Sequence, residues 1–232
     1  MTRQVPWPRI FAEGAAIVVS ILLAFGIQAW WTQVQERQQA AGYVERLTLD
    51  IESDTANWRE QAEGFALKQE RLERVLEWLR SPSSGDLSEP ELLNDLLQAG
   101  SHTYGGVAFR TRRAAFDELI STGSLRLLSP SLRRALLEYY AEVAFYGSVI
   151  AERDTDYAKR ILELVPRDRG YFEARADLSQ TERRRIAQRL RSADLESLAL
   201  AELNRSFLHE QGVESVRTQA DTLLSLLQVR LD

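Results

Sequence analysis

The sequence predicts an all-α protein, in which an N-terminal transmembrane helix continues into a long stalk helix and an elongated antiparallel helical bundle stands outside the membrane. Three observations lead to this fold class. A run of 18 residues near the start, residues 14–31, carries no formal charge. Apolar residues then return at every seventh position from Val44 to Leu79, and no segment alternates long enough to predict a strand. We therefore divide the chain into a membrane anchor, residues 1–32, and a helical bundle domain, residues 33–232.

The membrane span is expected over about residues 11–31. Its uncharged part is long enough to cross the hydrocarbon layer and longer than the core of a usual signal peptide. The tryptophans at its two ends are about 35 Å apart along a helix, which is about the distance between the aromatic belts of a bilayer. A glutamate in the first turn can reach headgroup water. Four residues are therefore expected to anchor the helix at the membrane interfaces: Trp7, Glu13, Trp30 and Trp31.

Two alternatives compete with a membrane span. A secretion signal could be cleaved after the small-residue pattern Ala24-Phe25-Gly26, which follows an apolar core. A buried helix of a soluble protein would also be apolar, but no other segment of the chain is so uniformly apolar. The helical pattern runs through the cleavage pattern without a break, so we prefer the span to both alternatives.

Small side chains recur every four residues within the span and lead to an amide. Such a ridge lets two helices approach closely in lipid, where the amide can hydrogen-bond across the contact. The alternative is that alanine and serine are simply common in bacterial spans. The residues of this predicted helix-packing ridge are Ala12, Ala16, Ser20, Ala24 and Gln28.

The charges that flank the span predict its orientation. Arg3, Arg9 and the amino terminus precede it, whereas Arg37 and Arg46, which follow it, are offset by glutamates. The positive-inside rule therefore favours a cytoplasmic N-terminus, with the bulk of the chain outside the cytoplasm.

The stalk helix is expected over about residues 33–80. Asp54, Gln61 and Lys68 interrupt one side of its apolar seam. We therefore favour a helix in a globular bundle over an uninterrupted two-stranded coiled coil. The apolar positions that stand seven apart are Val44, Ile51, Trp58, Phe65, Leu72 and Leu79.

Helix start and stop signals divide the rest of the chain. Two capping boxes, Ser88 with Glu91 and Ser179 with Glu182, are expected to start helices. Two further helices should start at Ser129-Pro130, a serine N-cap followed by proline, and at the Thr111 cap. Gly123 should end a helix in the left-handed conformation. The expected long helices cover about residues 130–165 and 194–231, and the short ones about 89–99, 112–122 and 180–191.

The composition argues against several classes of protein. The net charge of -5 disfavours a nucleic-acid binder, and the absence of cysteine excludes disulfides and thiolate metal sites. His102 and His209 are the only histidines and stand in no metal-ligand spacing. Because catalytic and phosphate-binding motifs are also missing, we expect no enzyme, no cofactor and no metal.

Arginines outnumber acidic residues between Ser101 and Arg134. Guanidinium groups suit phosphate, so this segment could contact an anionic ligand or lipid headgroups near the loop that follows residue 100. The favoured alternative is that these arginines form salt bridges to the acidic stalk helix. The proposed contact residues are His102, Tyr104, Arg110, Arg112 and Arg113, and Arg126, Arg133 and Arg134 belong to the same basic segment.

Two blocks of sequence carry a resemblance to a known family. The first is FAEG at residues 11–14 with AFGIQAWW at residues 24–31, and the second is AFDELISTGSLRLL at residues 115–128 with LEYY at residues 137–140. Together they resemble a family of bacterial proteins of unknown function that have one N-terminal transmembrane helix and a helical remainder. The resemblance implies a single-pass protein of the bacterial inner membrane and implies no activity.

The leading functional hypothesis is a non-enzymatic, membrane-anchored helical scaffold or accessory subunit. Its expected partners are membrane lipid and either further copies of itself or the other subunits of a larger membrane complex, with no nucleic acid. A first alternative is an extracytoplasmic sensor or ligand-binding helical module. A second alternative is arginine-mediated binding of a polyanion or of lipid headgroups.

Overall fold

The computed structural model describes residues 7–81, 90–100, 111–150, 155–167, 174–192 and 194–228, of which residues 7–14, 90, 150 and 192 are described by their backbone alone. Within these ranges the chain forms α-helices and one 3-10 helix, with no strand, which confirms the all-α prediction. The elements are α1 (Trp7–Arg80), α2 (Pro90–Ala99), α3 (Ala114–Ser121), η2 (Ser124–Leu127), α4 (Pro130–Ile150), α5 (Asp156–Leu164), α6 (Gln180–Ser192) and α7 (Leu195–Gln228).

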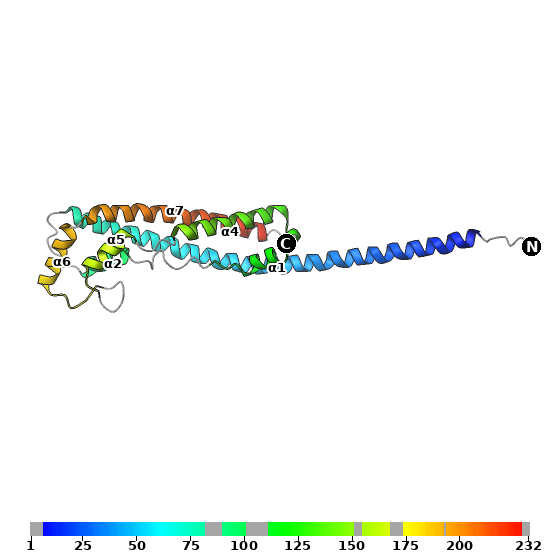
Figure 1. Ribbon diagram of the computed structural model, residues 1–232, viewed down its shortest axis with the longest axis horizontal. Helices are drawn as coiled ribbons and strands as arrows, with labels where there is room; N and C mark the ends of the chain where they lie inside the picture. Colours follow the sequence, from blue (N-terminus) through cyan, green and yellow to red (C-terminus); the bar gives the residue numbers. More distant parts are fainter. Residues whose placement is uncertain are drawn as a thin grey trace, which may run out of the picture.

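A single helix, α1, sets the length of the molecule. Its 74 residues measure about 110 Å at 1.5 Å per residue. The first part of α1 projects alone, and the second part lies inside the bundle (Figure 1). Helix α7 runs antiparallel to α1 along the bundle, since Arg80 near the end of α1 meets Glu196 near the start of α7, at 2.7 Å. Helix α4 lies beside both near the projecting end, and α2, α5 and α6 lie at the far end (Figure 1).

The bundle buries two separate apolar cores. The proximal core, near the projecting part of α1, joins α1, α3, α4 and the second half of α7. The distal core joins the end of α1 to α2, α5, α6 and the start of α7. The largest fully buried side chains include Trp58, Phe65 and Tyr139 in the proximal core and Tyr157 in the distal core. Each helix therefore buries its apolar stripe against neighbours from distant parts of the chain.

The seven-residue repeat of α1 marks the buried seam, as predicted. Val44, Ile51, Trp58, Phe65 and Leu72 are all buried. The sixth position, Leu79, is only partly buried, and Trp78 beside it is buried instead.

Three of the predicted helix signals are confirmed. Gly123 has φ +68°, in the left-handed region that glycine adopts at low cost. Ser129 Oγ accepts a hydrogen bond from Leu132 N at 3.3 Å, and α4 begins at Pro130. Ser179 and Glu182 form the reciprocal capping box, with Ser179 N donating to the Glu182 carboxylate at 2.9 Å. The predicted Ser88 cap lies outside the described residues.

The predicted Thr111 cap is wrong, because α3 begins at Ala114 with Arg113 as its N-cap residue. Two buried side chains explain the later start. Asp54 accepts a hydrogen bond from Arg112 N at 3.0 Å, and Tyr140 Oη donates to Arg112 O at 2.9 Å. The peptide groups of Arg112 are therefore engaged by α1 and α4 and are not free to start the helix.

The single helix predicted over about residues 130–165 is two helices, α4 and α5. Thr155 has an extended backbone (φ -74°, ψ 151°), and its hydroxyl accepts a hydrogen bond from Ala158 N, so a new helix begins there. Helix α5 then packs in the distal core, where Tyr157 Oη donates to Leu96 O of α2 at 3.2 Å. The last predicted helix, about residues 194–231, is α7 as far as the described residues extend. Two of its large apolar side chains, Leu200 and Phe207, are exposed.

Candidate functional site

The first half of α1 is bare of other protein. Each residue from position 15 to position 33 is exposed, which makes 19 consecutive residues, or about 28 Å of helix. The hydrocarbon core of a bilayer is about 30 Å thick. In the described part of the chain, α1 is the only helix that is long and apolar enough to cross a membrane. None of the apolar stretch of α1 is buried. The alternative of a helix buried in the core of this chain is therefore wrong. This bare segment, residues 15–33, is a candidate membrane span.

The predicted packing ridge lies on this bare segment. Ala16, Ser20, Ala24 and Gln28 are all exposed, at intervals of four residues along one helix. The Ser20 hydroxyl donates to Ala16 O at 2.7 Å, so it is already satisfied within the helix. The Gln28 amide makes no hydrogen bond to any described residue. The predicted ridge residue Ala12 belongs to α1, but its side chain lies outside the described part.

Trp30 and Trp31 close the bare segment at the side of the bundle. They are 61% and 55% exposed, and their ring centroids are 6.3 Å apart. The other two predicted anchors, Trp7 and Glu13, belong to α1, but the structure describes only their backbone. Two exposed indoles at the end of an apolar helix are typical of the membrane interface.

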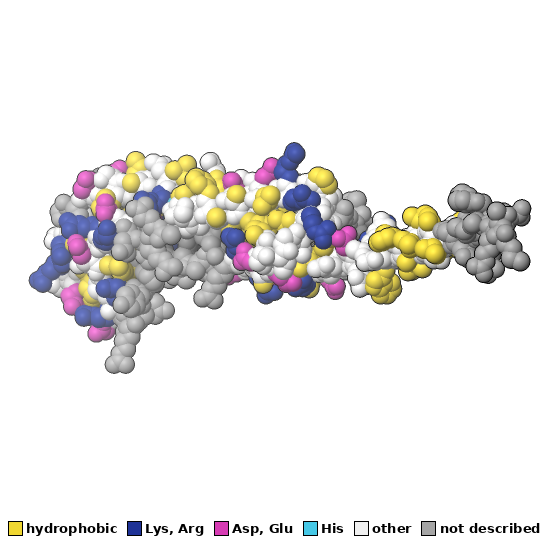
Figure 2. All heavy atoms as spheres, turned by 45° about the vertical axis from the view of Figure 1, so that its right-hand side comes forward, with side chains coloured by type: hydrophobic (Ala, Val, Ile, Leu, Met, Phe, Trp, Pro, Cys, Tyr) yellow, Lys and Arg dark blue, Asp and Glu magenta, His cyan; other side chains and the backbone are white. Residues whose placement is uncertain are grey.

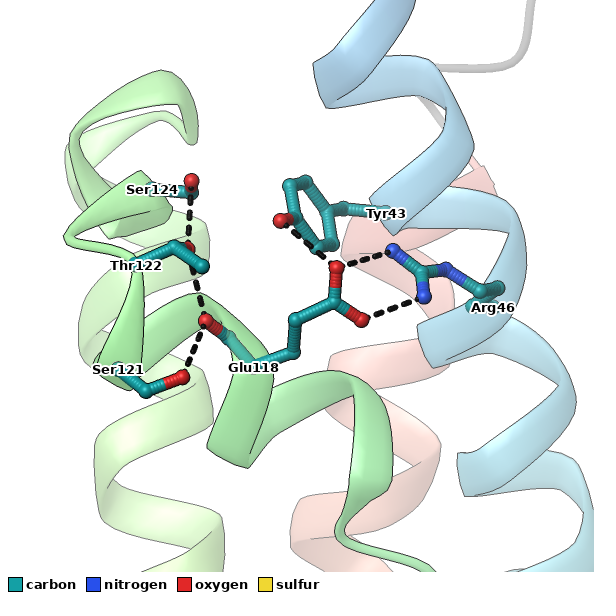
Figure 3. A network of polar contacts seen from close by, with 6 residues as sticks. All are labelled: Tyr43, Arg46, Glu118, Ser121, Thr122 and Ser124. Atoms are coloured by element: carbon teal, nitrogen blue, oxygen red, sulfur yellow. Dashed lines mark hydrogen bonds and ion pairs between the residues drawn. The ribbon is translucent and has the colours of Figure 1, made fainter.

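A polar cluster fastens α3 and the following turn to α1 where the bundle begins. Figure 3 shows the Glu118 carboxylate between Tyr43 and Arg46, two residues of α1. Arg46 donates to it from both terminal nitrogens, at 2.6 and 3.3 Å, and Tyr43 Oη donates at 3.1 Å. These bonds, with that of Arg46 the largest cause, lower the pKa of Glu118. Thr122 Oγ1 donates back to Glu118 O at 2.7 Å and turns the chain toward η2.

Three described arginines of the basic segment contact other parts of the bundle. Arg126 forms an ion pair with Glu36 of α1 at 2.7 Å, as the salt-bridge alternative predicted. Arg133 donates to carbonyl oxygens of residues 125, 126 and 128. Arg113 lies over the rings of Phe116 and Tyr140, with its guanidinium carbon 5.7 and 5.4 Å from their centroids. Arg112 is exposed. The other proposed anion contacts, His102, Tyr104 and Arg110, lie outside the described residues.

Sequence reasoning missed a buried carboxylate network in the proximal core. Trp58 Nε1 donates to Tyr139 Oη at 3.2 Å, and Tyr139 Oη donates to Asp54 Oδ2 at 2.9 Å. The other oxygen of Asp54 accepts from Arg112 N. Burial raises the pKa of Asp54 to about 6, although its hydrogen bonds from Arg112 and Tyr139 favour the ionised form. The position of Asp54 beside the apolar seam was the available signal.

The elevated pKa of Asp54 predicts a pH dependence of stability. Its folded-state value of about 6 lies above the unfolded value near 4, so the folded state binds more protons between these two pH values. The free energy of unfolding should therefore fall by about 2 kcal/mol from this group as pH rises from about 4 to about 7. Because other carboxylates titrate in the same range, the test is the difference between wild type and Asp54→Asn in chemical denaturation. A difference that stays constant over this pH range would contradict the prediction.

A polar waist separates the two cores and contains a buried ion pair. Lys68 donates to Glu202, and their side chains are only 11% and 3% exposed. Next to this pair, Gln69 Nε2 donates to Glu210 at 2.8 Å and Ser206 Oγ donates to Phe65 O at 3.4 Å. Asp54, Gln61 and Lys68 all lie on the interior face of α1. Asp54 and Lys68 have hydrogen-bond partners there, whereas Gln61 Oε1 is buried without one among the described residues.

The described residues contain no group of three or more His, Asp or Glu side chains that could hold a metal ion. Comparisons with family models, with curated proteins and with solved structures find no match for this chain.

Proposed function

We propose that this protein is a membrane-anchored helical scaffold or accessory subunit that assembles through its membrane span and stalk. The bare segment is the observation that supports this proposal most strongly. It presents 19 exposed residues without a formal charge, directly before the helix enters a bundle with two apolar cores. A soluble protein rarely leaves so large an apolar surface uncovered.

The polar end of the ridge supports the proposal of assembly within the membrane. Gln28 lies four residues from the middle of the bare segment, about 6 Å along the helix and well inside the hydrocarbon layer. An amide without a hydrogen-bond partner there costs several kcal/mol. The small residues that precede Gln28 on the same ridge allow a second helix to approach closely enough to supply that partner.

The flanking charges support the orientation proposed for the bundle. Two arginines and the amino terminus precede the span, while Arg37 follows it next to Glu36. This asymmetry favours an N-terminus in the cytoplasm and a bundle outside it. The resemblance to a family of bacterial single-pass proteins supports the placement of the chain in the bacterial inner membrane.

Cysteine cross-linking tests whether the ridge forms a helix–helix contact. Only the introduced cysteines can react, because the chain has no cysteine of its own. Ala16→Cys, Ser20→Cys and Ala24→Cys are expected to form disulfide-linked dimers in native membranes under mild oxidation, since a shared face brings these positions together. The matched controls, Val18→Cys and Leu22→Cys, point about 200° away on the helix and should stay monomeric. An accessory subunit would instead become cross-linked at the ridge, through a bifunctional thiol reagent, to one partner of different mass. Equal cross-linking at ridge and control positions would contradict assembly through this face.

A further inference from the structure

A groove opens where α1 enters the bundle. It lies between α1 and η2 and has a volume of about 490 Å³. Its apolar lining comes from Ala40, Ala41, Val44 and Leu127, and Gln33, the last residue of the bare segment, also lines it. Figure 2 shows basic and acidic side chains on the bundle next to the apolar bare segment. The groove is therefore amphipathic and begins where the apolar surface of α1 ends.

The position of the groove places its entrance at the membrane surface, if the bare segment spans the membrane as proposed above. The headgroup layer extends about 5–8 Å beyond the hydrocarbon on each side. At 1.5 Å per residue, Glu36 and Arg37 lie about 5–6 Å beyond the end of the bare segment at Gln33. Both side chains line the groove, so its polar end is at the depth of lipid phosphates.

The charges of the groove suit a phosphodiester. Arg37 and Arg126 line it together with Glu36, which leaves a net charge of +1. Arg37 is exposed and has no carboxylate partner among the described residues. Arg126 and Glu36 are paired, but their side chains are 70% and 37% exposed, so Arg126 can turn to a second anion at little cost. Two guanidinium groups bind phosphate oxygens in a defined geometry, and the apolar lining suits the glycerol and first methylenes of a lipid.

The geometry points to a binding site for the headgroup of one anionic phospholipid in this groove. The volume fits a phosphate with its glycerol and lies in the range of small-molecule pockets, while the acyl chains stay in the bilayer. Because residues of both α1 and η2 line the groove, a lipid held there would tie both elements to the membrane surface.

Native mass spectrometry of the full chain in mild detergent tests this site with an equal mixture of phosphatidylglycerol and phosphatidylethanolamine. One phosphatidylglycerol should be retained in preference. Arg37→Gln and Arg126→Gln should each lower that preference about fivefold. Ala41→Phe, which fills the groove and keeps both charges, should also remove it. The matched control Arg59→Gln changes an exposed arginine of α1 outside the groove lining and should retain the preference.

Three results would overturn the site. These are equal retention of the two lipids, a preference that survives both the arginine and the Ala41 substitutions, and displacement of the lipid by millimolar inorganic phosphate. Circular dichroism of each variant checks that the bundle remains folded. Fractionation of the same cells separates this inference from the proposed function. A wild-type chain that stays in the membrane without a lipid preference defeats the groove alone, whereas a chain absent from the membrane defeats the proposed function.

Discussion

Trp58→Ala is expected to lower the free energy of unfolding of the bundle by about 4 kcal/mol. Trp58 is among the largest fully buried side chains and lies in the proximal core. Its removal leaves a large cavity between α1 and α4 and deprives Tyr139 Oη of the donor at 3.2 Å. Denaturant unfolding of the full chain in mild detergent, followed by circular dichroism, measures this loss.

Two control variants separate the contributions of Trp58. Trp58→Phe keeps most of the volume and removes the indole N–H, so a smaller loss of about 1–2 kcal/mol is expected. Trp30→Ala removes an exposed tryptophan of the bare segment and should leave the unfolding of the bundle unchanged. A loss below about 1 kcal/mol for Trp58→Ala would show that this residue is not part of a close-packed core.

Glu202→Ala is expected to destabilise the bundle by about 3–5 kcal/mol, because it leaves the Lys68 ammonium in the polar waist without its carboxylate. Both side chains are nearly buried, so water cannot fully replace the lost partner. The same denaturant titration measures the effect.

A double substitution provides the control for the ion pair. Lys68→Met with Glu202→Leu removes both charges and keeps similar volumes, so its stability should lie within about 1–2 kcal/mol of the wild type. Together with the single variants Lys68→Met and Glu202→Leu, this double variant should show a strong coupling in a double-mutant cycle. If Glu202→Ala alone were as stable as the wild type, the waist would be open to solvent, contrary to the structure.

The sequence predicted the parts of the fold that depend on neighbours along the chain. The seven-residue repeat from Val44 to Leu72 identified the buried seam of α1, because helix geometry alone places these residues on one face. Gly123 and the Ser179–Glu182 capping box identified a helix stop and a helix start, because their hydrogen bonds and backbone angles are local.

The parts that the sequence did not predict depend on contacts between distant residues. The later start of α3 follows from hydrogen bonds of Arg112 to Asp54, 58 positions earlier, and to Tyr140. The predicted helix is divided into α4 and α5 because Thr155 caps a new helix and Tyr157 of that helix packs against α2. The apolar periodicity continues across this division, so periodicity alone predicted one long helix.

The same distinction between local and long-range contacts applies to the candidate sites. Hydropathy located the bare segment, because the length and charge of a span are local properties. The arginine segment suggested an anion contact over residues 102–113, whereas the groove inferred here combines Arg126 with Arg37, which is 89 positions away. Sequence spacing does not predict this pairing, because α1 and η2 meet only in the folded bundle.

The most direct test of the membrane span is the labelling of single cysteines in intact cells with a membrane-impermeant maleimide. Gln38→Cys, exposed on α1 just beyond the bare segment, should react from outside the cytoplasm. Leu22→Cys, in the middle of the bare segment and away from the ridge, should react only after detergent is added, because thiolates do not form in hydrocarbon. Equal labelling of the two positions without detergent would contradict the span. A mature chain that never labels at Leu22→Cys, even in detergent, would show that the segment is a cleaved signal.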